Sequence, residues 1–295
     1  MAQWRKTAIG FALVAPLAVV LWQGWRAARM ELAAFDPPRG PVARPDSLDG
    51  LEGLRDVDVV VGSGSRAITV RGFWVPTQNG AAVVLAHGSY CNRMSMLAEA
   101  RALGRAGFGV VFFDWPGHGE SDGRVTLGET ELASLRAVVD FVTAQPGVDG
   151  ARIGALGTSV GAALLAKAAS TDRRLRALVL VGAFTDSEVQ TRYEFRRPWA
   201  YWPALWVDHR HMEAPLKPIE VMPALTGRAL LVVAGEKDAV VPPSMAQALY
   251  ARAPGPDKEL WLVPGAGHSD LEETTAGEFT SRIARFFERT LAAKG

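Results

Sequence analysis

The chain has 295 residues, and its 32 Lys and Arg side chains nearly balance 31 Asp and Glu side chains, giving a formal net charge of +1. This balance excludes the strongly basic surface that nucleic-acid-binding proteins carry, so no nucleic-acid partner is expected. The single cysteine, Cys91, excludes an internal disulfide. After the amino-terminal segment, the chain is still long enough for one domain with a large core.

The first 30 residues form a separate segment. Arg5 and Lys6 precede an apolar run from Ala8 to Trp22, which approaches the length of a bilayer-crossing helix when the next three residues are included. Tryptophans flank the run on both sides, and no small-x-small cleavage site lies close to it. We expect residues 1–30 to be an uncleaved transmembrane helix of a single-pass membrane protein with an extracytoplasmic catalytic domain. The alternatives are a cleaved signal peptide with secretion, or a domain facing the cytoplasm.

Residues 31–55, with a Pro- and Arg-rich stretch at 36–45, are predicted to be a linker. From residue 56 to 295, strand-like and helix-like runs follow one another. The expected strands are 57–61, 68–74, 81–86, 110–114, 153–156, 178–181, 230–234 and 260–263. The expected helices are 94–105, 127–144, 160–169, 244–253 and 279–292.

Several of these strands are apolar throughout, as in Leu178 to Val181, which indicates burial on both faces and a mostly parallel sheet. We therefore predict an α/β fold with a mostly parallel eight-stranded sheet flanked by helices. In this architecture the functional site lies at the carboxyl ends of the strands. The long interval between the strands ending at 181 and beginning at 229 predicts a small cap insertion at about 186–226.

The sequence G-T-S-V-G at residues 157–161 directly follows an apolar strand, as in a nucleophile elbow that holds a serine above the sheet. Small residues at these positions let strand and helix approach closely. A second G-x-S-x-G match at residues 119–123 has no strand directly before it and two acidic residues beside its serine. Ser159 is therefore the predicted nucleophile.

A nucleophilic serine needs a histidine base and a carboxylate that orients the base. His268 follows the last predicted strand in a glycine-flanked loop, and Asp238 lies in the turn after the preceding strand. These positions fit the chain order Ser, Asp, His. The alternative acids are Glu236, Asp186 and Asp270.

Two backbone amides are needed to stabilise the oxyanion. Val160 follows the nucleophile and opens a predicted helix, so its N–H is the first expected donor. The loop after strand 81–86 begins His87-Gly88-Ser89, and we expect the second donor to be the N–H of Ser89, with Tyr90 as the alternative. His87 is expected to brace this loop.

The cap insertion is rich in aromatic residues. We expect Trp199, Trp202 and Trp206, together with Tyr90, to contact substrate; in the alternative, the cap aromatics only pack against each other. The sequence Asp208-His209-Arg210-His211 has no remote fourth ligand, so we interpret it as a solvated turn. No metal and no cofactor are predicted.

Over roughly residues 56–295 the chain resembles the α/β-hydrolase superfamily. The likeness lies in residues 85–89, residues 113–121 (F-D-W-P-G-H-G-E-S), the elbow, and the loops of Asp238 and His268. It is most similar to the serine aminopeptidase-like or lysophospholipase-like branch, in which many members are membrane-tethered. The resemblance implies that Asp114 and His118 are parts of the scaffold.

These features together predict a serine hydrolase that cleaves carboxylic ester or thioester acyl groups through an acyl-enzyme. Its expected substrate is a small-molecule or lipid-like acyl ester. Its amino-terminal helix is expected to attach it to a membrane. An acyltransferase or a peptidase on the same scaffold, or a non-catalytic ligand-binding relative, are the alternatives.

Overall fold

The computed structural model describes the backbone of residues 2–37 and 39–293 and the side chains of residues 16–37 and 39–293. Within this part of the chain one eight-stranded sheet runs in the order β1-β2-β4-β3-β5-β6-β7-β8. β2 is antiparallel to β1 and β4, and the remaining neighbours are parallel. The predicted α/β architecture with a mostly parallel sheet is confirmed.

The strands lie close to their predicted positions. They are β1 (Arg55–Val61), β2 (Ile68–Val75), β3 (Ala82–Ala86), β4 (Gly109–Phe113), β5 (Ile153–Thr158), β6 (Leu175–Val181), β7 (Ala229–Gly235) and β8 (Lys258–Val263).

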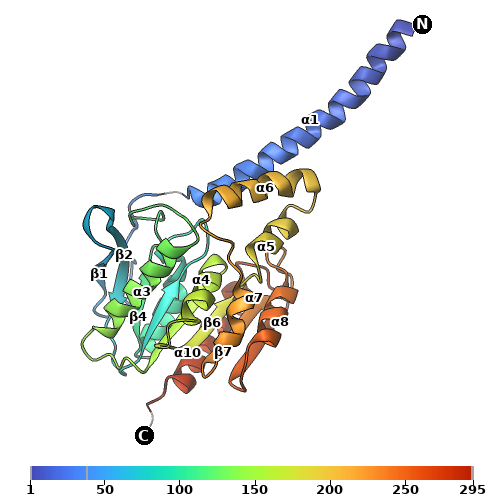
Figure 1. The fold of residues 1–295 in the computed structure, drawn as a ribbon. Coiled ribbons are helices and arrows are strands. Elements are labelled where there is room, and N and C mark those ends of the chain that lie inside the picture. Colours follow the sequence, from blue (N-terminus) through green and yellow to red (C-terminus); the bar gives the residue numbers. More distant parts are fainter. Residues whose placement is uncertain (1, 38, 294–295) are drawn as a thin grey trace.

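Helices cover both faces of this sheet (Figure 1). One face carries α3 (Glu129–Thr143), α4 (Val160–Ala169), α7 (Pro218–Val221) and α8 (Pro243–Arg252). The other carries α2 (Leu97–Arg105), α9 (Leu271–Thr274) and α10 (Glu278–Thr290). α5 (Ser187–Glu194) and α6 (Pro198–His211) lie in the predicted cap interval, and short 3-10 turns η1 (Gly64–Arg66), η2 (Arg93–Met96) and η3 (Met222–Ala224) complete the described elements.

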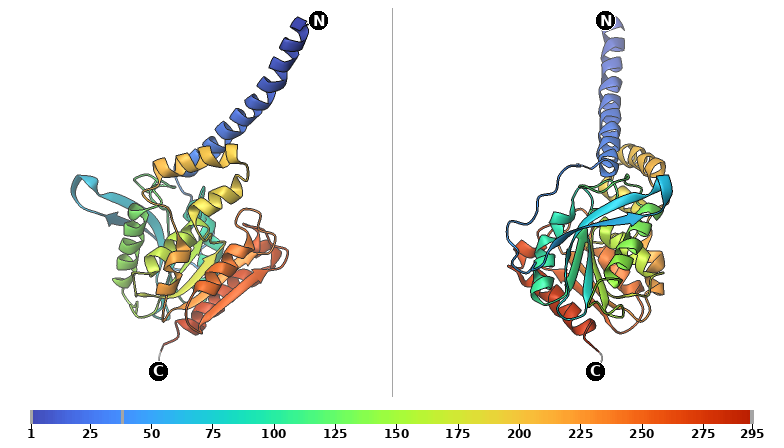
Figure 2. Two further views of the ribbon diagram at one scale, coloured as in Figure 1. Left: turned by 45° about the vertical axis from the view of Figure 1, so that its right-hand side comes forward. Right: turned by 90° about the vertical axis from the view of Figure 1, so that its left-hand side faces the viewer.

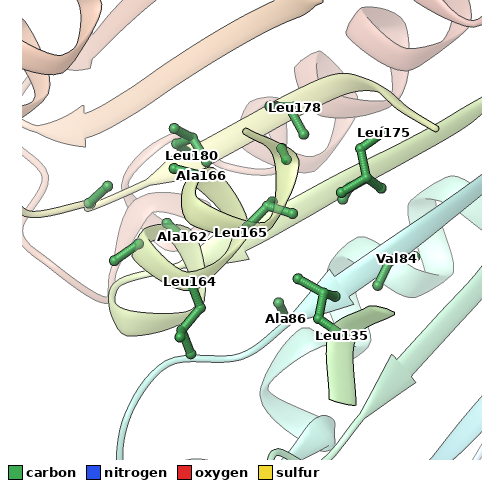
Figure 3. Packing of buried hydrophobic residues seen from close by; sticks show 14 of the residues in the cluster. Val84, Ala86, Leu135, Ala162, Leu164, Leu165, Ala166, Leu175, Leu178 and Leu180 are labelled. Atoms are coloured by element: carbon green, nitrogen blue, oxygen red, sulfur yellow. The ribbon is translucent and has the colours of Figure 1, made fainter. Parts of the chain in front are cut away.

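The core is formed where alternate strand residues meet these two helical layers. Val84 and Ala86 of β3 face α3 and α4, whereas Val83 and Leu85 face the α2 and α10 side. Figure 3 shows Leu164 and other apolar side chains of α4 among those of β3, β6 and α3. This double burial explains why the strands lack a polar face.

The amino-terminal helix α1 (Ala2–Phe35) projects away from the sheet, with α6 beneath its carboxyl-terminal part (Figure 2). The two helices cross at Gly24, where an added Cβ would lie 2.7 Å from the carbonyl oxygen of Trp199. Ala27 packs against Ala204, and Phe35 packs against Val207. The second half of α1 is therefore part of the folded domain.

The predicted transmembrane anchor is not supported. Within the described residues, no helix has both the length and the apolar character required to cross a membrane. Much of the apolar run that begins at Ala8 consists of residues whose side chains lie outside the described part. The described part of α1 carries Gln23, Arg26, Arg29 and Glu31, and it packs on α6.

Residues 36–37 and 39–54, which fall in the predicted linker, follow the surface of the domain. Arg39 donates to the carbonyl oxygen of Ser121 at 2.5 Å, and Leu51 is fully buried beside the α2 layer. Arg101 donates to the carbonyl oxygen of Asp49 at 3.0 Å. These contacts continue the fold from α1 to β1.

We expect removal of residues 1–35 to lower the midpoint of thermal unfolding by several degrees, because Ala204 and Val207 lose their apolar cover. A chain that begins at residue 16 keeps the described α1–α6 contact and serves as the control. Thermal unfolding monitored by circular dichroism compares the two. Equal midpoints would show that α1 does not stabilise the domain.

Candidate active site

Ser159 lies between β5 and α4 in a strained backbone conformation, with φ 52° and ψ −119°. Its N–H donates to the carbonyl oxygen of Val181 at 2.8 Å, which fixes the turn to the end of β6. An added Cβ at Gly161 would lie 2.3 Å from the carbonyl oxygen of Ala86. Only glycine permits this approach, so the small residues of the motif hold Ser159 in its strained position.

His268 and Asp238 form a direct hydrogen bond. The Nδ1 atom of His268 lies 2.7 Å from Oδ2 of Asp238, whose side chain is buried. Oδ1 of the same carboxylate accepts from the amides of Val240 and Val241 at 2.9 and 2.8 Å. Gly182 lies beside the imidazole, since an added Cβ would be 3.0 Å from its Cε1 atom. The Asp238 carboxylate is thus oriented by its own turn and can orient the histidine.

The three alternative acids have other contacts. Asp186 caps α5 by accepting from the amide of Glu188 at 2.8 Å. Asp270 accepts from the amide of Gly267 at 2.6 Å, and Glu236 is exposed. Of the four predicted acids, the structure brings Asp238 to the histidine.

The loop after β3 approaches the nucleophile closely. An added Cβ at Gly88 would lie 3.3 Å from the Cβ of Ser159. Ser89 and Val160 both line the same cavity as Ser159. Because Val160 opens α4, its N–H has no acceptor within the helix. Both residues predicted to supply amide donors therefore line the cavity that contains Ser159.

Buried polar contacts support this loop from below. His87 donates from Nδ1 to the carbonyl oxygen of Gly88 at 2.7 Å and accepts at Nε2 from the amide of Trp115 at 3.2 Å. This pattern requires a neutral imidazole, and burial lowers its pKa to about 4. Arg93 pairs with Asp114 at 2.5 Å and also with Glu120. Sequence reasoning missed Arg93, which ties the start of η2 to the loop after β4.

Ser121, the serine of the second G-x-S-x-G match, is fully buried. Its hydroxyl donates to the carbonyl oxygen of Asp114 at 2.7 Å and accepts from the amide of Arg71 at 2.8 Å. It therefore has a structural position.

Ser159 and His268 open into one cavity of about 600 Å³. Phe184, Leu127 and Met212 form apolar parts of its lining, and the carboxyl-terminal end of α1 contributes Glu31 and Ala34. The contribution of α1 to this cavity was not predicted, because residues 31–55 had no helical signal and were assigned as a linker.

Five carboxyl side chains line the cavity, from five different helices, and the described lining contains no lysine or arginine. They are Glu31 of α1, Glu99 of α2, Glu194 of α5, Asp208 of α6 and Glu272 of α9. We call the three from the cap side, Glu31, Glu194 and Asp208, the roof carboxyls.

Desolvation raises the pKa of each roof carboxyl. Repulsion by Asp208 adds to this effect at Glu31 and Glu194, whereas the hydrogen bond with Glu31 opposes it at Asp208. Glu31 and Asp208 share a hydrogen bond, which requires a proton on one of them. Asp208 also accepts from the hydroxyl of Thr191 at 2.7 Å. Tyr90 joins this group by donating its hydroxyl to the carbonyl oxygen of Met30 at 3.2 Å, and burial raises its pKa to about 12.

The cap tryptophans lie away from the cavity. Trp199, Trp202 and Trp206 are 38%, 58% and 65% exposed, and none of them is among the cavity-lining residues. Trp199 and Trp202 instead border an open apolar groove between α6 and α1. Asp208 of α6 and Met212, the residue after the helix, line the cavity instead.

The sequence from Asp208 to His211 is the last turn of α6, which corrects the prediction of a solvated turn. Its side chains have separate contacts, because successive helical residues point in different directions. Asp208 is buried in the roof, His209 lies 3.1 Å from Glu188, and His211 stacks on Phe35.

Comparison with known protein sequences identifies a family for this chain. Residues 93–294 match the sequence profile of the prolyl oligopeptidase family. A protein of Mycobacterium tuberculosis described as uncharacterised is 34% identical over 261 residues, covering 87% of this chain and 86% of that relative. A thiohydrolase of Aspergillus aculeatus is 32% identical over 107 residues, covering 35% of this chain and 34% of its own.

Solved structures share the fold. An esterase of Pyrococcus furiosus has a TM-score of 0.74 at 22% identity, covering 88% of this chain and 98% of its own. The esterase domain of a Rhodothermus marinus protein has a TM-score of 0.58 at 22% identity, covering 81% and 100%. The predicted α/β-hydrolase fold is confirmed.

The raised pKa of Glu31 makes stability depend on pH. The folded protein keeps a proton on Glu31 that the unfolded chain loses above the ordinary value of 4.5, so the free energy of unfolding falls as pH rises toward about 9. Glu31→Gln keeps the shape without the titration, and its stability should fall less over this range. Urea unfolding at several pH values measures the two slopes. The control is Glu220→Gln, at an exposed side chain outside the cavity; equal slopes in wild type and Glu31→Gln would contradict the interpretation.

Proposed function

Since the chain belongs to the prolyl oligopeptidase family, within the α/β-hydrolase superfamily, we propose that it is a serine hydrolase that cleaves carboxylic ester or thioester acyl groups through an acyl-enzyme. One observation carries this proposal. A serine in a strained elbow opens into the same cavity as a histidine that is hydrogen-bonded to a buried aspartate. A protein that only binds ligands has no use for such strain.

In the proposed reaction, the Ser159 oxygen attacks the substrate carbonyl carbon while His268 takes the hydroxyl proton at Nε2. Asp238 holds the histidine through Nδ1 and stabilises the imidazolium that forms. The amides of Val240 and Val241 keep the Asp238 carboxylate in the required orientation. Collapse of the tetrahedral intermediate breaks the bond between the acyl carbon and the leaving group, and His268 gives the proton to that leaving group.

The amides of Val160 and Ser89 are the proposed oxyanion donors, with Tyr90 as the alternative to Ser89. Val160 is the first residue of α4, so its amide has no acceptor within the helix, and the loop carrying Ser89 lies against the elbow. Water then attacks the acyl-enzyme, His268 again acts as base, and the carboxylic acid leaves with Ser159 restored.

The substrate is proposed to be a small-molecule acyl ester or thioester. The apolar side chains of Phe184, Leu127 and Met212 offer a surface for an acyl chain beside Ser159. Esterases among the structural neighbours and the thiohydrolase among the relatives support an acyl substrate by analogy.

The family match favours one second candidate, cleavage of a peptide bond by the same serine. Both reactions pass through an acyl-enzyme, and they differ in the leaving group. A matched ester and amide with one acyl group separate them: faster turnover of the ester supports the first proposal, and comparable or faster turnover of the amide supports the second.

We expect Ser159→Ala to lower kcat by at least about a thousandfold, because loss of the nucleophile leaves only substrate binding and oxyanion stabilisation. Steady-state hydrolysis of a short-chain ester measures the effect, and circular dichroism verifies folding. Ser121→Ala is the control for the second G-x-S-x-G match: it should lower the stability of the fold and keep the hydrolytic activity. Turnover by folded Ser159→Ala at the wild-type rate would contradict the proposal.

Asp238→Asn should lower kcat by orders of magnitude, about ten-thousandfold in the best-studied triad, because an amide favours the wrong imidazole tautomer. Glu236→Gln, Asp186→Asn and Asp270→Asn test the alternative acids under the same assay and should keep most of the activity. If one of these three variants is inactive while Asp238→Asn is active, the acid has been assigned to the wrong loop.

A further inference from the structure

The cavity beside Ser159 is acidic in a way that the proposed hydrolysis does not require. Its described lining carries five carboxyl groups and no lysine or arginine, although the whole chain has nearly equal numbers of both signs. A lining of this kind disfavours anionic substrates, such as acyl phosphates or fatty acyl groups with terminal carboxylates, through like-charge repulsion.

Among the carboxyls that line the cavity, Glu99 is the buried one with an unpaired oxygen. It is only 7% exposed, it lines the cavity, and its Oε2 atom has no hydrogen-bond partner among the described residues. Buried polar atoms are nearly always hydrogen-bonded, and leaving one unpaired costs free energy. An unpaired carboxylate oxygen beside a nucleophile is therefore a candidate contact for a group of the substrate.

Three of the other four carboxyls have hydrogen bonds within the protein, and the fourth, Glu194, is exposed. Glu272, which faces Glu99 from α9, accepts from the amide and the hydroxyl of Thr280, both at 3.0 Å. In the roof, Glu31 and Asp208 are hydrogen-bonded to each other. The unpaired oxygen of Glu99 is therefore available to a ligand, and the other carboxyls of the lining are further acidic groups in the same cavity.

Burial and the nearby Glu272 raise the pKa of Glu99 to about 7. A carboxyl with this pKa is partly protonated at neutral pH, so an arriving cation draws off the proton and gains a charged partner. A positive charge is the ligand feature that best offsets burial of a carboxylate, provided that the pair is desolvated together.

We propose that the cavity selects acyl substrates that carry a positively charged group, and that Glu99 receives this group. The inference rests on the proposed hydrolysis and names the class of its substrate: an ester or thioester with an ammonium or quaternary ammonium group in its alcohol or acyl part. Glu99 acts as a specificity residue and takes no part in bond cleavage.

Two matched pairs of esters test the proposal. The first compares butyrylcholine with 3,3-dimethylbutyl butyrate, and the second compares the methyl esters of 4-(trimethylammonio)butyrate and 5,5-dimethylhexanoate. Each pair has the same shape, with nitrogen replaced by carbon. For at least one pair, we expect kcat/KM of the cationic ester to exceed that of the neutral ester by about tenfold or more.

The Glu99→Gln variant should bring this ratio toward one, because it keeps the shape of the side chain and removes its charge. Glu220→Gln, an exposed carboxyl outside the cavity, is the matched control and should keep the wild-type ratio. A ratio near one in wild type for both pairs, or a ratio unchanged by Glu99→Gln, would overturn the proposal.

A measurement on the wild-type protein covers the case in which Glu99→Gln fails to fold. The ratio should rise with pH through about 7, as Glu99 loses its proton. His268 also lines the cavity and is the proposed base for both esters of a pair. The other titratable groups lining the cavity are Glu31, Tyr90, Cys91, Glu194, Asp208 and Glu272, while His209 and Glu188 act on Asp208. A ratio that is flat or falls with pH would count against Glu99.

A direct binding measurement separates failure of the proposed hydrolysis from failure of the proposed cation site. If neither ester of either pair is cleaved, calorimetry compares binding of choline with that of 3,3-dimethylbutan-1-ol, its uncharged analogue. Tighter binding of choline that is lost in Glu99→Gln supports the cation site without the reaction, and equal or no binding of the two overturns it. If both esters of each pair are cleaved at equal rates, the proposed cation site is overturned and the proposed hydrolase activity is retained.

Discussion

The close approach of the first turn of α4 to the end of β3 is the constraint on which the site depends. Gly161 lies so near the carbonyl oxygens of Ala86 and His87 that any side chain would collide with backbone. This contact brings the β3 loop against the elbow and holds Ser159 at positive φ. The loop is in turn supported by the neutral His87 and by the buried Arg93–Asp114 pair. The strained conformation of the serine persists because many contacts of the surrounding core fix it.

The second organising feature is α1, which contributes to the site as well as to the fold. Its last turns cover α6 and place Glu31 beside Asp208 over the cavity. The roof carboxyls thus depend on a helix that comes before the sheet in the sequence. Changes in α1 are therefore coupled to the electrostatics around the substrate as well as to stability. Residues 39–54 then follow the domain surface to β1.

The sheet and the residues near Ser159 could be predicted because their signals are local. Uniformly apolar strands require two buried faces, and the spacing of G-x-S-x-G requires a tight turn. The cap could not be predicted in detail, because the orientation of α6 depends on α1. Its tryptophans were expected to contact substrate, yet the helix turns them outward and turns Asp208 inward. Glu31 and Glu99 gave no signal, since an acidic residue in a helix usually faces water and only tertiary packing buries these two.

The central claim is that Ser159 forms a covalent acyl intermediate in this cavity. Incubation with a fluorophosphonate, followed by proteolysis and mass spectrometry, identifies the modified side chain directly, because this reagent phosphonylates an activated serine. The account predicts one adduct per chain, on Ser159, with labelling abolished by heat unfolding. An adduct on another residue, or an unmodified Ser159 in the folded protein after prolonged exposure, would contradict it.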